Sequence, residues 1–399
     1  MTEEQKQKLA LVGQIYTPAY PIEIKELFSG RTNELMTILG IINQKGKQAI
    51  LYGDRGVGKT SFANVVKVLM ENPDRQIVKV SCASNDTLES LFFNIFSKLS
   101  MSYEVAKQRI GFGAEVEKTE ESVLFSNIYS KDQIDNNIIL KVLEMAGPLI
   151  IIIDEFDRLE KGKFDQKLFS DLLKAVSDSI PSTSFLIVGV AEDVSSLIEE
   201  HQSIERNLAQ IHLYSMTGEE IKGIIEKGEE SLGITFSDEV KSKIIELSSG
   251  YPHFTHSLCY YAATAAIWDE NKEITIDYLN LAIQQTIDNS HESLRNSYRV
   301  ATLATKQNIY QEVLYAAALV QTDEYGYFQA NDLEDILTKM VGREMKVNNF
   351  VFHLGKFCSE ERGEIFRISG AKNRHRYKFK NPLMKSFIRL KMEQKKNIA

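Results

Sequence analysis

The stretch Gly53-Asp54-Arg55-Gly56-Val57-Gly58-Lys59-Thr60-Ser61 fits the pattern G-x-x-x-x-G-K-[ST] and decides the interpretation of the chain. Its glycines let the backbone curl so that successive N–H groups face one anion. A short apolar strand pattern at 48–51 precedes the stretch, and a helical pattern at 60–70 follows it. The N-terminus of that helix adds a dipole that favours negative charge. The sequence therefore predicts a phosphate-binding loop between a strand and a helix.

Two side chains of this loop are expected to contact a nucleotide and its metal ion directly. Lys59 would reach the β- and γ-phosphates, and the Thr60 hydroxyl would ligate Mg²⁺. The alternative is a glycine-rich turn that contains a lysine by chance, but the flanking strand and helix patterns argue against it. The predicted ATP-binding residues are Gly53, Asp54, Arg55, Gly56, Val57, Gly58, Lys59, Thr60 and Ser61.

A second motif begins with the continuous apolar run Leu149–Ile153, which leads directly into Asp154 and Glu155. An apolar strand followed by two carboxylates is the Walker B pattern. Asp154 would hold Mg²⁺, directly or through water, and Glu155 would orient and deprotonate the attacking water. The alternative is a buried strand that ends in a solvated acidic turn. The adjacent Asp157 and Arg158 are interpreted as a surface pair.

The order of strand and helix patterns predicts an α/β architecture. The runs at 149–153 and 185–190 are continuously apolar, as in strands buried on both faces of a parallel sheet. Helical patterns at 60–70 and 88–99 alternate with the strand patterns. Residues 102–135 interrupt this alternation, contain Gly111-Phe112-Gly113, and are expected to form an insertion of loop and short elements.

The second half of the chain is mostly helical. Thr217 and Glu220 form a capping-box signal. Helices are expected near 218–231, 238–248, 253–268 and 276–288. In the last hundred residues, helical patterns at 305–319, 331–340 and 346–358 precede strand patterns at 364–369 and 376–380, which is the layout of a winged helix. The expected domains are an N-terminal segment at 1–24, an α/β core at 25–215, an all-α helical lid at 216–292 and a winged-helix domain at 293–399.

Composition excludes several other classes of protein. The chain has 399 residues, enough for two or three domains, and a net charge of −8 that gives no global signature of a nucleic-acid binder. Cys82, Cys259 and Cys358 lack the spacing of a zinc site or a disulfide framework. Because the sequence shows neither a signal peptide nor an apolar run of about 18 residues, a cytoplasmic protein without a membrane partner is expected.

Several features resemble the AAA+ superfamily of P-loop ATPases, and within it the origin-recognition initiator ATPases and the related STAND signalling ATPases. Phe28-Ser29-Gly30-Arg31, followed by Glu34-Leu35, is similar to the family segment F-x-G-R-x-x-E-L that lies beside the adenine. The resemblance implies an AAA+ core with a helical lid and a nucleotide contact by Arg31. The alternative for this segment is a turn followed by an N-capped helix.

Two further positions gain roles from the resemblance. Ser203-Ile204-Glu205-Arg206 precedes the strand pattern 211–213, where the family places an arginine finger that reaches the γ-phosphate of a neighbouring subunit. A catalytic Arg206 implies self-assembly, whereas the alternative is an arginine on a helix surface. Gly250-Tyr251-Pro252-His253 resembles the G-x-P turn of STAND proteins, which implies that Pro252 lies near the nucleotide, and His253 is a weaker candidate for phosphate contact.

The chain departs from the initiator pattern at two places. It lacks the sensor arginine of a G-D-x-R motif near His253, and Gly189–Asp193 lacks the asparagine that often follows the strand at 185–190. These departures bear on the rate of hydrolysis more than on nucleotide binding. They favour a slow switch over a fast motor.

The segment from Arg362 to Lys396 is rich in basic residues, although the whole chain is acidic. In a strand, Arg374, Arg376, Lys378 and Lys380 would share one face, which could contact a phosphate backbone. The presumed recognition helix at 346–358 is largely apolar, which argues against base readout. DNA contact and packing against a protein partner or the ATPase itself both remain open.

The combined motifs predict an ATPase that hydrolyses ATP with Mg²⁺ to drive a conformational or assembly switch. The switch would be coupled to DNA or to a partner effector protein. The predicted catalytic residues are Lys59, Glu155 and Arg206, and the predicted metal ligands are Thr60 and Asp154. The alternative function is a DNA-binding initiator or regulator in which ATP binding only sets the affinity for DNA.

Overall fold

The computed structural model describes residues 2–18, 21, 30–108, 116–191, 194, 206–303, 308–371 and 374–398. By its contacts, the chain divides into two compact units. One unit, called the sheet unit here, comprises residues 31–53 and 59–213. The other, called the helical unit, comprises residues 1–30, 54–58 and 214–399.

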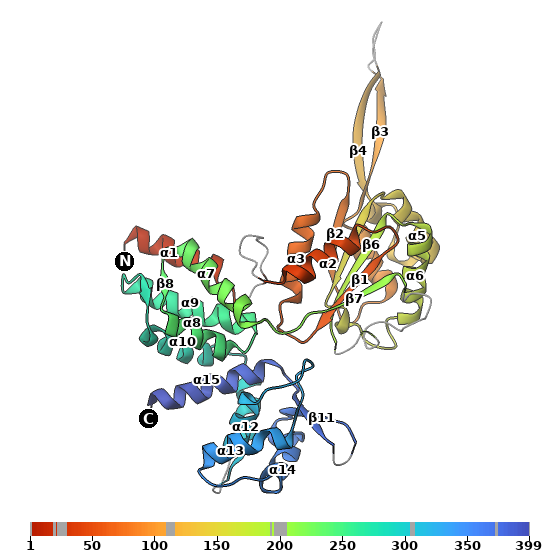
Figure 1. Cartoon of the computed structure of the whole chain (residues 1–399). Coiled ribbons are helices and arrows are strands. Elements are labelled where there is room, and N and C mark those ends of the chain that lie inside the picture. The colour runs from red at the N-terminus through yellow and green to blue at the C-terminus, as the bar shows by residue number, and fades with distance from the viewer. Residues whose placement is uncertain are drawn as a thin grey trace. The chain divides into compact units, whose positions relative to one another are not determined.

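A five-stranded parallel sheet forms the centre of the sheet unit, with the strand order β2-β5-β6-β1-β7 (Figure 1). The strands are β1 (Gln48–Gly53), β2 (Gln76–Ser81), β5 (Leu149–Asp154), β6 (Thr183–Val190) and β7 (Leu208–His212). Every residue of β5 is buried, as its apolar run predicts. In register, Ile151 lies beside Phe185 of β6, and Ser81 of β2 lies beside Asp154.

Helices cover both faces of this sheet. The helices α2 (Thr32–Ile42) and α3 (Lys59–Met70) contact β1 and β6, while α4 (Leu88–Phe96) contacts β2 and α6 (Gln166–Ser179) contacts β6. Ile151 and Ile153 join one large apolar cluster with residues of α4, α6 and α5 (Asn136–Met145). Since successive strand residues alternate between faces, the residues between them pack on the opposite side. The carboxyl ends of β1 and β5 therefore reach the same edge of a sheet that is buried on both faces.

The expectation of loop and short elements at 102–135 is wrong in part. The strands β3 (Ser100–Gln108) and β4 (Val116–Leu124) form an antiparallel hairpin that extends from the sheet unit (Figure 1). The alternation of Met101, Tyr103 and Val105 with other residues is the period of a strand, but the polar composition concealed it. Short 3-10 turns follow at Phe125–Asn127 (η2) and Lys131–Gln133 (η3), and Gly111-Phe112-Gly113 lies outside the described residues.

The helical unit begins with α1 (Glu3–Ile15), which packs against α7 (Gly218–Leu232) and α9 (Pro252–Trp268). The helices α8 (Asp238–Ser248) and α10 (Ile276–Asp288) complete the group, and the short strands β8 (Thr235–Phe236) and β9 (Glu273–Ile274) pair in parallel. The four helices predicted here are confirmed to within one residue. The capping box is confirmed too, because the Thr217 hydroxyl accepts from the Glu220 N–H and the Glu220 carboxylate accepts from the Thr217 N–H.

Tyr16 attaches the end of α1 to α7. Its side chain is buried, and its hydroxyl donates to the carbonyl oxygen of Ile225 at 3.2 Å. A Cβ on Gly228 would lie 1.9 Å from the Tyr16 hydroxyl oxygen, so the tyrosine fits only because position 228 has no side chain. The segment before residue 24 thus contributes a packed helix to the helical unit.

The last part of the helical unit has the elements expected of a winged helix. The bounds are α11 (Glu292–Thr302), α12 (Tyr310–Leu319), β10 (Phe328–Gln329), η6 (Ala330–Leu333), α13 (Glu334–Val341), α14 (Val347–Lys356), η7 (Glu360–Arg362), β11 (Phe366–Ser369), β12 (Arg376–Phe379) and α15 (Leu383–Ile398). The strands form an antiparallel sheet in the order β10-β12-β11. The helix α15, which the sequence reading did not anticipate, packs against α8, α10, α11 and α12.

Within the described ranges, no helix combines the length and the apolar character that crossing a bilayer requires. Cys82, Cys259 and Cys358 are free cysteines.

His256 of α9 gives this fold a pH dependence. The ring is buried, and its Nδ1 accepts a hydrogen bond from the backbone N–H of Thr17 at 3.3 Å. Burial lowers the pKa of His256 from 6.5 to about 4. As the pH falls from 6.5 towards 4, His256 becomes protonated in the unfolded chain but stays mostly neutral in the folded chain. The stability that is present above pH 6.5 is therefore lost across this window, by about 3 kcal/mol in total.

We expect His256→Asn, which keeps an acceptor but cannot take up a proton, to flatten the fall in stability between pH 6.5 and pH 4.5. Urea unfolding of both proteins at several pH values measures the difference. His291, whose exposed ring lies at the start of α11, supplies the control variant His291→Asn. Equal pH slopes for wild type and His256→Asn would contradict the assignment.

Candidate functional site

The phosphate-binding loop begins where β1 ends, and its glycines adopt conformations that other residues avoid. The φ angles of Gly53, Gly56 and Gly58 are +146°, +87° and +97°. A Cβ on Gly53 would lie 2.3 Å from the carbonyl oxygen of Leu213, just after β7. Glycine is therefore required at Gly53 by both conformation and space.

Lys59 is the first residue of α3 and is folded back over the start of the loop. Its side chain is buried, and Nζ donates to the carbonyl oxygen of Gly53 at 3.0 Å. The first N–H groups of a helix lack partners within the helix, so an anion can be bound at this end of α3. Lys59, the N-terminus of α3 and the carboxyl end of β1 thus meet at one edge of the sheet.

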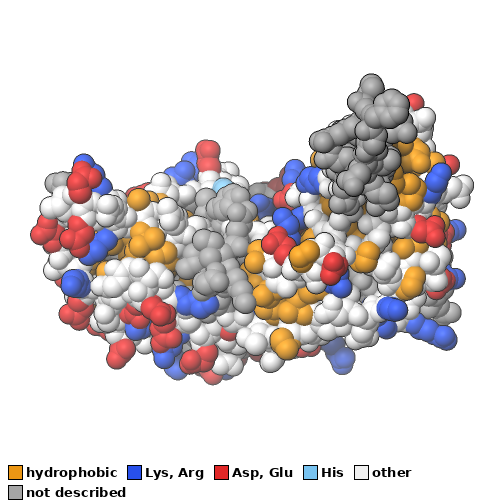
Figure 2. All heavy atoms as spheres, turned by 90° about the horizontal axis from the view of Figure 1, so that it is seen from above, with side chains coloured by type: hydrophobic (Ala, Val, Ile, Leu, Met, Phe, Trp, Pro, Cys, Tyr) orange, Lys and Arg blue, Asp and Glu red, His pale blue; other side chains and the backbone are white. Residues whose placement is uncertain are grey.

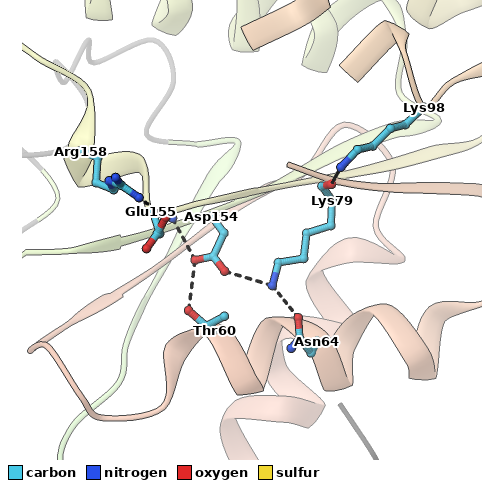
Figure 3. Close-up of polar contacts among 7 residues, drawn as sticks. All are labelled: Thr60, Asn64, Lys79, Lys98, Asp154, Glu155 and Arg158. Atoms are coloured by element: carbon cyan, nitrogen blue, oxygen red, sulfur yellow. Dashed lines mark hydrogen bonds and ion pairs between the residues drawn. The ribbon is translucent and has the colours of Figure 1, made fainter. Parts of the chain in front are cut away.

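Thr60 and Asp154 meet at this same edge, although 94 residues separate them in sequence. The Thr60 hydroxyl donates to Oδ1 of Asp154 at 3.4 Å (Figure 3). The same oxygen accepts the backbone N–H of Glu155 at 2.9 Å, and Asp154 is only 2% exposed. Hydroxyl and carboxylate oxygens are ligands that Mg²⁺ prefers, and Mg²⁺ usually takes one or two carboxylates with its remaining positions filled by water and phosphate. The donor set fits a metal ion that arrives with a nucleotide.

Glu155 lies directly beyond β5 in a left-handed conformation, with φ of +55°. Its carboxylate pairs with the Arg158 guanidinium at 2.7 Å, and both side chains are about half exposed (Figure 3). Asp157 and Arg158 both lie at the surface, as predicted, and Asp157 also accepts the backbone N–H of Val190 at the end of β6, at 2.8 Å. An exposed ion pair is worth little energy, so Glu155 can leave Arg158 at low cost.

Two further predicted residues, Arg31 and Arg206, belong to the sheet unit. Arg31 is buried at the start of α2, has φ of +61°, and lies 3.8 Å from the Glu34 carboxylate. Arg206 is exposed, and its carbonyl oxygen accepts from the Lys47 ammonium at 2.5 Å. Phe28, Ser29 and Ser203-Ile204-Glu205 lie outside the described residues.

The loop residues 54–58 belong to the helical unit, where they lie against residues of α9, β12 and α15. A Cβ on Gly58 would lie 3.9 Å from Pro252, the first residue of α9, and one on Gly56 would lie 2.9 Å from Leu383 of α15. Asp54 pairs with the Lys378 ammonium of β12 at 3.0 Å, and Lys378 is only 6% exposed.

The other predicted nucleotide-binding residues differ in how far they are buried. Arg55 is exposed, whereas Val57 is buried and Ser61 is half-buried. The His253 ring, a weaker candidate for phosphate contact, lies with Nδ1 2.7 Å from the carbonyl oxygen of Pro18, and burial lowers its pKa.

Two lysines pair with predicted site residues, and no sequence pattern predicted either pair. The sequence places Lys378 on a basic strand face, yet the side chain is buried and pairs with Asp54. Lys79 of β2 pairs with Oδ2 of Asp154 at 3.0 Å (Figure 3). A lysine inside an otherwise valine-rich strand was the available signal for Lys79, because such a strand rarely buries a charge without a partner.

Comparison with known proteins gives a family model and two curated relatives. The family model described as Novel STAND NTPase 1 matches residues 18–326. An ORC1-type DNA replication protein of Methanocorpusculum labreanum is 26% identical over 152 residues, which cover 37% of this chain and 33% of the relative. A second one, of Methanoregula boonei, is 22% identical over 181 residues, which cover 43% of this chain and 39% of the relative. The chain therefore spans well under half the length of these relatives.

Solved structures confirm the fold class. The Aeropyrum pernix ORC2 protein, solved as ADPNP and ADP complexes, matches with a TM-score of 0.50 and 14% identity, covering 97% of this chain and 98% of that chain. The Walker-type ATPase PABY2304 of Pyrococcus abyssi matches with a TM-score of 0.51 and 13% identity, covering 93% and 99%. The predicted α/β core with a parallel sheet is confirmed, and its fold is similar to that of the Aeropyrum pernix ORC2 protein.

We expect Gly53→Ala to destabilise the protein more than Gly147→Ala does. Both glycines have positive φ angles, but a Cβ on Gly147 would meet nothing within 4 Å. Each variant incurs a conformational cost of about 1 kcal/mol or more, and Gly53→Ala adds about 1–3 kcal/mol of overpacking against Leu213. Denaturant unfolding gives both values, and equal losses would show that the close approach to Leu213 is absent.

Proposed function

Because the chain belongs to the Novel STAND NTPase 1 family, we propose that it binds ATP with Mg²⁺ at Gly53–Ser61 and hydrolyses the nucleotide to drive a conformational or assembly switch. The contact between Thr60 and Asp154 carries this proposal. It brings two oxygen ligands suited to Mg²⁺ to the N-terminal end of the same helix whose first residue is Lys59.

Each residue of the site has a separate task in this mechanism. The loop N–H groups and Lys59 bind the phosphates, for which Lys59 exchanges the Gly53 carbonyl for a phosphate oxygen. Thr60 and Asp154 would hold Mg²⁺, which neutralises charge that develops on the phosphate oxygens. Glu155, after leaving Arg158, orients the attacking water and accepts its proton.

The ion pair between Asp54 and Lys378 supports a switch that extends to the C-terminal elements. Lys378 is buried, and its charge is balanced by a residue inside the phosphate-binding loop. Bound phosphates would add negative charge next to Asp54 and compete for Lys378. Because breaking one side of a buried pair is costly, the position of β12 would depend on whether the loop is occupied.

The exposure of Arg206 supports the proposal that the switch controls assembly with a neighbouring subunit. The side chain is exposed in the single chain, which suits a residue that completes the nucleotide site of a neighbouring copy. The site would then be complete only in an oligomer or a complex with a protein partner.

Binding of DNA is a second candidate function, favoured by the basic segment and by relatives described as DNA replication proteins. Three of the four residues of the predicted basic strand face have acidic partners, however. Arg376 pairs with Asp323, Lys378 with Asp54 and Lys380 with Glu364. On the face drawn in Figure 2, the described acidic and basic side chains are also intermixed. We therefore favour a protein partner over a nucleic acid.

We expect Lys59→Ala to abolish tight ATP binding, because the variant loses the cation that contacts the phosphates. Fluorescence or calorimetric titration with ATP and Mg²⁺ measures the affinity. Lys67→Ala, on the same helix two turns beyond the loop, is the matched control and keeps wild-type affinity. An unchanged affinity in Lys59→Ala would refute the proposed site.

Glu155→Gln is expected to bind ATP as wild type does and to hydrolyse it at least about 100-fold more slowly, because the amide cannot accept a proton from water. Phosphate release under single-turnover conditions separates the two steps. Hydrolysis at the wild-type rate would exclude Glu155 as the base.

We expect little retention of the protein on duplex DNA near 50 mM salt, with or without ATP. Co-sedimentation with DNA across a salt series measures it. Retention that falls steeply with salt, by the linear log–log relation of counterion release, would instead favour the DNA-binding function.

A further inference from the structure

Asp154 is held from two sides by groups of different chemistry. Its Oδ1 accepts the Thr60 hydroxyl and the Glu155 backbone N–H, and is the oxygen that faces the phosphate-binding helix (Figure 3). Its Oδ2 pairs with the Lys79 ammonium at 3.0 Å. The carboxylate therefore presents one oxygen to Thr60 while Lys79 occupies the other.

Lys79 reaches Asp154 from the neighbouring strand. It lies on β2, which pairs with β5, and its register partner is Ile152, two residues before Asp154. Nζ also donates to Oδ1 of Asn64 at 2.5 Å. Asn64 is one helical turn after Thr60 on α3, so the two side chains share a face of that helix. Lys79 thus joins β2, β5 and α3 at the position where the two predicted metal ligands meet.

The surroundings of Asp154 require a cation. The side chain of Asp154 is 3% exposed and that of Lys79 is 18% exposed. A buried carboxylate without a counter-charge would be strongly unfavourable, and no resident metal is needed if a lysine supplies that charge. A partner that fixes the orientation of a ligand also sets metal affinity, and its loss typically costs about 10–100-fold.

We propose that Lys79 is a positioning residue for Mg²⁺ binding: it holds Oδ2 of Asp154 so that Oδ1 stays aligned with the Thr60 hydroxyl. This inference rests on the proposed nucleotide site. Lys79 touches neither metal nor nucleotide and acts through Asp154. It also confines Asp154 to one-oxygen ligation, which leaves room around the metal for water and phosphate oxygens, as Mg²⁺ prefers.

The test measures nucleotide binding rather than turnover. The affinity of wild type and Lys79→Met for ADP is titrated in EDTA and at stepped Mg²⁺ concentrations. In EDTA the two affinities should agree within about threefold, because Lys59 and the loop amides remain. The Mg²⁺ concentration for half-maximal enhancement of binding should rise at least about tenfold in Lys79→Met.

Two further variants separate positioning from a structural role. Lys79→Arg keeps the charge and donors, and should restore the Mg²⁺ requirement to within about threefold of wild type. Lys98→Met is the matched control, since Lys98 is exposed and donates only to the Lys79 carbonyl oxygen in this network (Figure 3). If Lys79→Met does not fold, Asn64→Ala takes its place, because it releases the ammonium without removing the charge, and should shift the Mg²⁺ requirement in the same direction by a smaller factor.

If the folded Lys79→Met variant needs the same Mg²⁺ concentration as wild type, the proposal is overturned. If it needs less Mg²⁺, the proposal is overturned too, because Lys79 would then compete with the metal. Wild-type binding that Mg²⁺ does not strengthen would overturn it too. Failure of wild type to bind ADP or ATP at all would instead refute the proposed function itself.

Discussion

The contact between the Thr60 hydroxyl and the Asp154 carboxylate is the constraint on which the rest of the site depends. It exists only if the strand before the phosphate-binding loop and the strand before Asp154 end at one edge of one sheet. The buried strands β1, β5 and β6 ensure this, since parallel strands sandwiched between helices leave little freedom of register. A largely apolar core thus positions the polar residues of the site.

The pairing of buried or partly buried acidic residues with lysines is a second constraint on the structure. Asp154 is balanced by Lys79 in the sheet unit, and Asp54 by Lys378 in the helical unit. A nucleotide site must hold both a metal ion and phosphates when loaded, yet remain folded when empty. Lysines that balance the acidic residues in the empty state provide a physical way to meet both demands, because their flexible side chains can shift as charge arrives.

Most of the fold and the core of the site could be predicted from local sequence patterns. The loop motif, the run into Asp154 and the helix boundaries after Thr217 follow from glycine placement, apolar periodicity and capping, all of which act over a few residues. The hairpin β3–β4 was missed because the sequence of its strands is largely polar and contains no continuous apolar run. Lys79 and Lys378 were missed because their partners lie 75 and 324 residues away, and no local pattern encodes such pairs.

The central claim is that the loop at Gly53–Ser61 and Asp154 together form a site for a nucleotide and a magnesium ion. Isothermal titration calorimetry of the wild-type protein with ATP, with and without Mg²⁺, tests it most directly. Saturable binding of one nucleotide per chain, tightened by Mg²⁺, is the predicted result. A folded protein that releases no heat with adenine or guanine nucleotides in the presence of Mg²⁺ would contradict the account.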